Sequence, residues 1–205
     1  MNKCMKRIGH GWQVAVYEYG THYVYKKPHT SYFFVCMTIL KDFPPLILQP
    51  LKLHRWRRIV QQRQLASLRV IANYIHLSKY LAHPVIESSG AYYQSRAIPV
   101  YRYVENLSKE KFEELVDDYA RLTYYLYEQG FIDKSFNFLK NFGILDGEVV
   151  LTDLGELFFG EQEIREQLEK RPWAHIKFIL ALSKEQRRYL VKVMDETFLS
   201  EKNNT

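Results

Sequence analysis

Two stretches in the first part of the chain differ clearly in pattern. Residues 13–27 mix Val and Tyr with polar residues, and Gly20 and Thr21 interrupt the run. β-branched and aromatic residues on both sides of a glycine turn are typical of two antiparallel strands. Prolines recur through residues 28–51, so we expect that segment to be irregular or to hold only a short helix or strand.

The middle of the chain is dominated by helical periodicity. Residues 53–80 contain neither Gly nor Pro and repeat apolar residues at three- and four-residue steps, which predicts a long helix. Residues 91–103 mix β-formers with polar residues and predict one or two strands that end in a connector. Residues 109–128 predict the clearest helix, because Ser108 is a suitable N-cap and Gly130 follows the last periodic position.

The C-terminal part adds a short strand and two helices. The strand follows an Asp-Gly turn at residues 146–147, and the helices are predicted near residues 161–170 and 183–199. The order of strands, helix, strands and then helices with a small inserted hairpin favours an α+β fold over alternating parallel βαβ units. A length of 205 residues fits one domain or two small lobes that share a cleft.

Composition narrows the function classes. The formal net charge of +6 and the pI of about 9.1 favour anionic partners such as nucleotides, nucleic acids or acidic membrane surfaces. Two cysteines exclude a disulfide framework or a four-cysteine zinc site, so we expect a reducing, cytoplasmic location. The longest apolar stretch, residues 32–40, is too short to cross a bilayer, and we expect no transmembrane helix.

A Gly-x-Gly motif, Gly9-His10-Gly11, precedes the predicted hairpin, and Lys26 lies on its second strand. This pair resembles the glycine-rich loop and strand lysine of protein kinases, where backbone approaches the phosphates and the lysine neutralises their charge. The alternative is ordinary, because Gly-x-Gly before a strand is common and Lys26 beside Lys27 fits a solvated strand.

A second set of residues lies in GFIDKSFNFLKNFGILDGEVVLTDLGEL, residues 130–157. This segment resembles a kinase catalytic loop, a β-hairpin and the metal-binding DFG element in a DLG form. The resemblance makes Asn141 and Asp153 the magnesium ligands, since an amide oxygen and a carboxylate suit a hard cation that also binds nucleotide phosphates. The alternatives are a turn former ahead of Gly143 for Asn141 and a turn aspartate for Asp153.

Together these motifs resemble the protein-kinase-like superfamily, close in size to minimal bacterial kinase-like proteins and lipopolysaccharide-core sugar kinases. The resemblance implies a β-rich N-lobe over residues 1–104, with the glycine-rich loop, the strand lysine and the long helix. It implies a reduced helical C-lobe over residues 105–205, with ATP and Mg²⁺ as cofactors and phosphotransfer as the activity. About fifty residues follow Asp153, without an APE-like motif, so we expect an acceptor other than a typical protein loop.

The predicted catalytic loop departs from the kinase pattern. Kinases place the catalytic aspartate five residues before the metal-binding asparagine, but here Phe136 stands five residues before Asn141. The nearest acid is Asp133, eight residues before Asn141, and it can act as the base only if the loop contains a local insertion.

The long helix departs as well. Residues 43–86 contain no Asp or Glu to pair with Lys26, and only Gln61, Gln62 or Gln64 could replace the usual glutamate, as a weaker neutral partner. Both departures favour the alternative of a catalytically inactive pseudokinase that binds a nucleotide or a partner.

The same helix carries uncompensated positive charge. A run of this kind is either a solvated face or a binding strip for a phosphorylated sugar, a lipid headgroup or nucleic acid, with Trp56 available for stacking. A basic nucleic-acid-binding domain unrelated to kinases is therefore a third hypothesis, and peripheral contact with a membrane is another use of the charge. The cations are Lys52, Arg55, Arg57, Arg58, Arg63 and Arg69.

Overall fold

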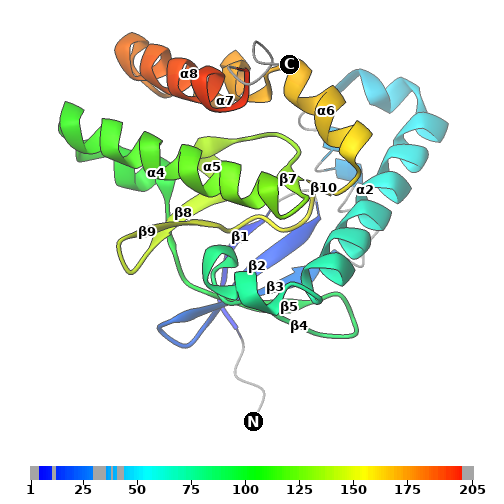
Figure 1. Cartoon of the computed structure of the whole chain (residues 1–205). Helices are drawn as coiled ribbons and strands as arrows, with labels where there is room; N and C mark the ends of the chain where they lie inside the picture. Colours follow the sequence, from blue (N-terminus) through cyan, green and yellow to red (C-terminus); the bar gives the residue numbers. More distant parts are fainter. Residues whose placement is uncertain (1–4, 11–12, 30–35, 38, 41–43, 200–205) are drawn as a thin grey trace. The chain divides into compact units, whose positions relative to one another are not determined.

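The chain folds into an α+β arrangement of helices and small antiparallel sheets. The computed structural model describes residues 5–10, 13–29, 36–37, 39–40 and 44–199 (Figure 1). Two compact units divide the chain, one of Met1–Ser78 with Ala82–Arg96 and the other of Lys79–Leu81 with Ala97–Thr205. The second unit takes in residues 97–104, which precede the boundary predicted from the sequence.

The first unit contains a five-stranded sheet in the order β1-β2-β3-β5-β4, with every neighbouring pair antiparallel. The predicted hairpin over residues 13–27 is confirmed as β2 and β3, which pair from Val14 opposite Pro28 to Tyr19 opposite Tyr23. Gly20, in the turn between them, has a φ of 65° that suits glycine. The strands are β1 (Arg7–His10), β2 (Val14–Tyr19), β3 (Tyr23–Pro28), β4 (Val85–Ile86) and β5 (Tyr92–Ser95).

The long helix of the first unit, α2, spans Pro50–Ile71 and follows the 3₁₀ helix η1 (Pro44–Leu48). The predicted end near residue 80 is wrong, because the chain leaves α2 at Ile71 and forms the 3₁₀ helix η2 (Ile75–Leu81). A continued α-helix would keep Ile75 on the buried face and turn Leu77 outward. Instead Ile75 is 81% exposed, whereas Leu77 is fully buried. Burial in the folded chain therefore overrides the local helical periodicity.

The second unit is mostly helical, with a three-stranded sheet in the order β6-β8-β9 and a two-stranded pair, β7 with β10. The N-cap predicted for its longest helix is confirmed, since Ser108 Oγ accepts a hydrogen bond from the Lys111 backbone at 3.4 Å. The strands are β6 (Ile98–Pro99), β7 (Ile132–Asp133), β8 (Phe142–Leu145), β9 (Glu148–Leu151) and β10 (Leu157–Phe158). The helices are α3 (Val100–Tyr103), η3 (Val104–Asn106), α4 (Lys109–Glu128), α5 (Phe138–Asn141), α6 (Glu161–Glu169), η4 (Pro172–Ala174), α7 (Ile176–Ile179) and α8 (Lys184–Leu199).

Three further predictions can be compared with these bounds. The strands predicted over residues 91–103 are confirmed as β5 and β6, but residues 100–103 form α3, which lets Val100 become fully buried. The hairpin turn at Asp146 and Gly147 is confirmed, with both residues at positive φ. The two C-terminal helices are confirmed as α6 and α8.

Aromatic side chains form much of the core of the second unit. Helices α4 and α8 lie side by side (Figure 1), and Tyr119 of α4 packs against Phe138 and Phe142 with ring centroids 4.8 and 4.7 Å away. Phe198 of α8 stacks on Trp173 at 5.4 Å. Among the described residues, no helix combines the length and apolar character needed to span a bilayer.

Candidate active site

Asp133 is the centre of a buried polar cluster in the second unit. It ends β7, and only 4% of its surface is exposed. Asn141 Nδ2 donates to Asp133 Oδ1 at 2.9 Å and to Oδ2 at 3.1 Å. Ser135 Oγ and the Asn137 backbone also donate to Oδ2, at 3.2 and 3.3 Å. The acid eight residues before Asn141 is therefore in direct contact with it.

The loop between Asp133 and Asn141 achieves this contact through an unusual backbone conformation. Phe136 has a φ of 47°, in the left-handed region that costs a non-glycine residue energy. Its carbonyl accepts a hydrogen bond from Tyr119 Oη at 3.2 Å. Its buried ring packs against Trp173 and Phe198, with centroids 5.5 and 5.6 Å away. Phe136 thus anchors the loop in the core. The spacing of eight residues, instead of the five in kinases, still brings Asp133 into contact with Asn141.

Asp153 is fixed next to Asn141 through the backbone. The backbone amides of Thr152 and Asp153 donate to the Asn141 carbonyl at 2.8 and 3.1 Å, and Thr152 Oγ1 donates to it at 2.9 Å. The Asp153 carboxylate accepts the Gly155 amide at 3.1 Å, which orients it within the Asp-Leu-Gly turn. The strand pairing of β8 with β9 holds both ends of this arrangement.

The surroundings of Asp133 shift its protonation. Burial, and to a smaller extent the negative charge of Asp153, raise the pKa of Asp133 to about 7, although the hydrogen bonds from Asn141, Ser135 and Asn137 act in the opposite direction. A carboxylic acid that titrates near neutrality can accept or release a proton under physiological conditions.

Two oxygen atoms of the cluster suit a divalent cation. All three side-chain hydrogen bonds of Asn141, two to Asp133 and one to Ser135 Oγ at 2.9 Å, use Nδ2, which makes Oδ1 the atom suited to a metal. The Asp153 carboxylate, half-buried, supplies a charged oxygen. Among the described residues, no group of three or more His, Cys, Asp or Glu could hold a metal. A cation here would therefore complete its coordination with phosphate and water oxygens, as Mg²⁺ commonly does.

The candidate residues of the first unit lie on its sheet. Lys26 is half-buried on β3, opposite Val16 and Tyr92, and its Nζ lies 5.5 Å from the centre of the Tyr92 ring. Gly9 lies on β1, where an added Cβ would approach nothing closer than 3.8 Å, so local packing does not require glycine there. Gly11, the second glycine of the motif, lies outside the described residues.

The three glutamines of α2 have different environments. Gln61 Nε2 donates to the His29 carbonyl at 3.4 Å, and Gln62 is exposed. Only 2% of the surface of Gln64 is exposed, and its Nε2 has no hydrogen-bond partner among the described residues. Gln64 is therefore the glutamine that faces the interior from α2.

The basic residues of α2 do not form one uniform strip. Arg55 and Arg58 are exposed, as is Arg69, whereas Arg57 and Arg63 are half-buried. Trp56, considered for stacking on a base, packs against the buried cluster of Cys36, Ile39, Leu46 and Leu53. The accessible cations are thus a subset of those predicted.

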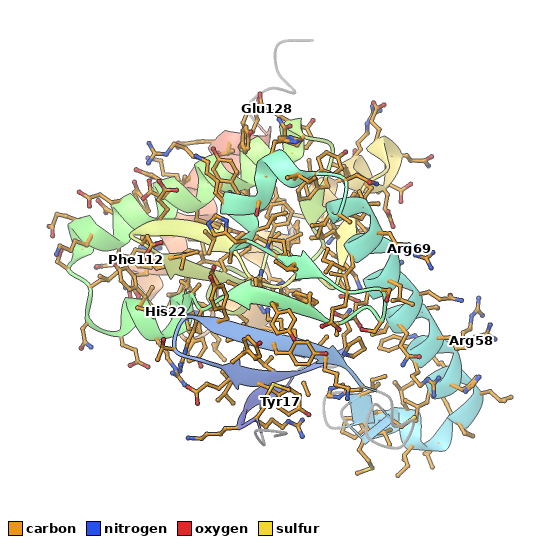
Figure 2. The ribbon with its side chains drawn as sticks, turned by 90° about the horizontal axis from the view of Figure 1, so that it is seen from below. Tyr17, His22, Arg58, Arg69, Phe112 and Glu128 are labelled. Carbon is orange, nitrogen blue, oxygen red and sulfur yellow. The ribbon has the colours of Figure 1, made fainter. Side chains whose placement is uncertain are left out.

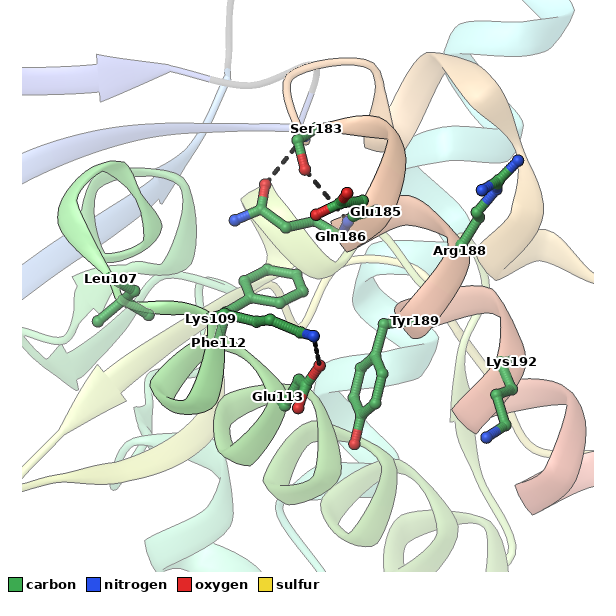
Figure 3. A pocket seen from close by; sticks show the side chains of 10 residues that line it. All are labelled: Leu107, Lys109, Phe112, Glu113, Ser183, Glu185, Gln186, Arg188, Tyr189 and Lys192. Atoms are coloured by element: carbon green, nitrogen blue, oxygen red, sulfur yellow. Dashed lines mark hydrogen bonds and ion pairs between the residues drawn. The ribbon is translucent and has the colours of Figure 1, made fainter.

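A separate pocket of about 550 Å³ lies between the first turns of α4 and α8 (Figure 3). Lys109, Arg188 and Lys192 line it together with Glu113 and Glu185, so cations and anions nearly balance. Lys109 and Glu113 form an ion pair of 3.9 Å across one turn of α4. No residue of the Asp133 cluster lines this pocket.

A scan against protein-family models and a search of curated proteins gave no match to the chain. The kinase resemblance accordingly depends on the residues themselves. Sequence reasoning missed Ser135, Asn137 and Tyr119, which position Asp133 and the loop. A serine two positions after the acid is a signal for Ser135, whereas Asn137 donates through its backbone amide and nothing local marks Tyr119.

Proposed function

We propose that this protein is an ATP- and Mg²⁺-dependent phosphotransferase of protein-kinase-like fold, acting on an acceptor other than a protein loop. The observation that carries the proposal is the double hydrogen bond from Asn141 Nδ2 to Asp133, beside an Asp153 whose backbone is tied to the same asparagine. This contact supports kinase-like roles for Asp133, Asn141 and Asp153, although the sequence spacing of Asp133 differs from that of kinases.

Each residue has a distinct role in this proposal. Asn141 Oδ1 and the Asp153 carboxylate would hold a Mg²⁺ ion, which would supply positive charge to neutralise and orient the phosphates. Asp133, oriented by Asn141 and Ser135, accepts the proton of the acceptor hydroxyl at a carboxylate oxygen. Lys26 of the first unit neutralises nucleotide phosphate charge, and its role is assigned by the resemblance alone.

The architecture of each unit supports the same class. The first unit is a five-stranded antiparallel sheet with one long helix inserted between its third and fourth strands. The second is helical, and its β8–β9 hairpin separates Asn141 from Asp153. We infer that these units are the two lobes of a small kinase-like protein.

The segment after Asp153 supports a small or lipid-linked acceptor. Strand β10 begins at Leu157 and pairs with β7, and α6 begins at Glu161. Too few residues separate Asp153 from these elements to form the long activation segment with which protein kinases hold a peptide. A phosphorylated sugar or a lipid headgroup fits the positive charge of the chain better.

A pseudokinase is the second candidate, and two observations favour it. The Asp133 carboxylate is buried and already accepts four hydrogen bonds, as a purely structural acid would. The buried residues of α2 include Gln64 but no acid, and a neutral amide would orient a lysine less strongly. In this case the site binds nucleotide without transferring phosphate.

Thermal unfolding with ATP, with and without Mg²⁺, and an ATP turnover assay test both candidates. Mg²⁺-dependent stabilisation with turnover supports the enzyme, and stabilisation without turnover supports the pseudokinase. Loss of turnover in Asp133→Asn with retained binding assigns the base, and Lys26→Met should weaken nucleotide binding. Asp146→Asn, in the exposed hairpin turn, is the matched control. If ATP and Mg²⁺ cause no stabilisation and there is no turnover, both candidates are rejected.

A further inference from the structure

Three exposed apolar residues lie within five positions at the junction of η1 and α2. Ile47, Leu48 and Leu51 are 67%, 84% and 86% exposed. Single exposed apolar side chains are common on protein surfaces, but three within one short junction form a local apolar projection.

The backbone that carries this projection is anchored. Leu46 and Leu53, which flank the exposed residues in the sequence, are buried in a cluster with Cys36 and Ile39. The Gln49 amide donates to the Leu46 carbonyl at 2.9 Å, and the Leu53 amide donates to the Gln49 carbonyl at 3.0 Å. The fold therefore fixes the outward direction of the apolar side chains, and their exposure is a property of the junction's geometry.

Positive charge continues from this projection along the exposed face of α2. Leu51, Arg55, Arg58 and Arg69 recur at helical spacing on one face, and Lys52 lies beside them. Figure 2 shows Arg58 and Arg69 projecting outward along the same side of α2. At 1.5 Å per residue, the face from Leu51 to Arg69 is about 27 Å long.

Within residues 43–86 no acid neutralises this face. Residues 43–86 contain no Asp or Glu, and none of the ion pairs among the described residues includes Lys52, Arg55 or Arg58. The face is thus complementary in charge to an extended anionic surface.

The apolar residues decide which anionic surface fits. Nucleic acid binding depends on cations and on aromatic stacking, and exposed leucines add nothing to phosphate contacts. Trp56, the aromatic residue of this helix, is partly buried and packs against the buried cluster instead. A membrane offers both a layer of anionic headgroups for the cations and an acyl boundary for inserted leucines.

We propose that α2 and η1 dock the protein on an anionic lipid bilayer, with Ile47, Leu48 and Leu51 inserted at the acyl boundary and Lys52, Arg55 and Arg58 among the headgroups. The site is an addition to the proposed phosphotransferase and depends only on the first unit. It stands or falls independently of nucleotide binding, because no residue of the Asp133 cluster takes part.

Vesicle co-sedimentation of the full chain tests the proposal. The probes are phosphatidylcholine vesicles with and without phosphatidylglycerol, at low and high salt. We expect binding only to the anionic vesicles, weakened by salt. Each basic residue near an anionic surface strengthens binding about fivefold, and a partly inserted leucine strengthens it about tenfold. The double variants Leu48→Ser/Leu51→Ser and Arg55→Gln/Arg58→Gln should therefore each reduce the partition coefficient at least about tenfold.

Two control variants match these changes elsewhere. Leu180→Ser alters a leucine of the second unit that is 67% exposed, and Arg165→Gln/Lys192→Gln removes two exposed positive charges from that unit. Both should bind as the wild type does. Equal binding by the wild type and Leu48→Ser/Leu51→Ser would overturn insertion. Membrane docking would be overturned if the wild type did not bind anionic vesicles at low salt. It would also be overturned if the protein bound an RNA or DNA oligonucleotide more tightly and the leucine changes did not affect that binding.

Discussion

Asn141 donates both of its amide hydrogens toward Asp133 and Ser135, and its bonds to the Asp133 carboxylate measure 2.9 and 3.1 Å. This relationship ties the end of β7 to the end of α5, just before β8, across an eight-residue step in sequence. It also separates two functions within one amide group. Nδ2 orients the acid, and Oδ1 is the atom suited to a cation. One side chain therefore connects the proposed base with the proposed metal site.

Stability of the metal-free protein should depend on pH through Asp133. The folded pKa of about 7 lies above the ordinary value of 3.8, so between these values the folded state keeps a proton that the unfolded state releases. Rising pH therefore favours the unfolded state, and the free energy of unfolding should fall by up to about 4 kcal/mol from pH 4 to pH 7. Urea unfolding across this range measures the effect. Asp133→Asn should be flatter than the wild type, and an equally steep curve would contradict the assignment.

Phe136→Ala should strongly destabilise the second unit. It removes a fully buried ring from contact with Trp173 and Phe198. We expect the free energy of unfolding to fall by about 3–5 kcal/mol. The φ of 47° gives a sharper comparison, because glycine adopts this conformation without strain. Phe136→Gly should be no less stable than Phe136→Ala, although glycine is usually the worse replacement. A glycine variant clearly less stable than the alanine variant would show that the left-handed conformation is absent.

Gly143→Ala should disturb the strand that follows Asn141. An added Cβ would lie 2.9 Å from the Ala97 side chain and 3.0 Å from the Ile98 carbonyl, so β6 and β8 would have to separate. We expect a loss of roughly 1–3 kcal/mol in the free energy of unfolding. The double variant Gly143→Ala/Ala97→Gly should recover part of the loss, because it removes the shortest of the three close contacts. Full stability of the single variant in urea would reject this packing.

Local patterns predicted the elements whose formation depends on nearby residues. The β2–β3 hairpin, the Ser108 cap of α4 and the Asp146-Gly147 turn follow from residues that contact each other within a few positions. The end of α2 was missed because periodicity continues past Ile71, and only tertiary burial of Leu77 turns the chain.

The candidate site was predictable only in part, for a similar reason. Spacing made Asn141 and Asp153 candidates, but it left the candidacy of Asp133 dependent on a local insertion in the loop. The contact forms because Phe136 takes a left-handed conformation and Tyr119 Oη, seventeen residues earlier, holds the Phe136 carbonyl. Neither the conformation nor the distant hydroxyl has a signature in the loop itself. The distinction between exposed Arg58 and half-buried Arg57 likewise required the packing of α2.

Asp153→Asn should abolish Mg²⁺-dependent nucleotide binding while the fold survives. The amide keeps an oxygen for the Gly155 backbone N–H, at 3.1 Å in the wild type, and removes the charge that a cation requires. A second readout needs neither metal nor nucleotide. Because the Asp153 charge raises the pKa of Asp133, its removal should lower that pKa and shift the pH dependence of stability to lower pH. Calorimetric titration with Mg-ATP and urea unfolding across pH measure the two effects separately, with Asp146→Asn as the control. Unchanged Mg-ATP binding together with a shifted pH dependence would leave the structural cluster correct and remove Asp153 from the metal site. Unchanged behaviour in both measurements would contradict the cluster itself.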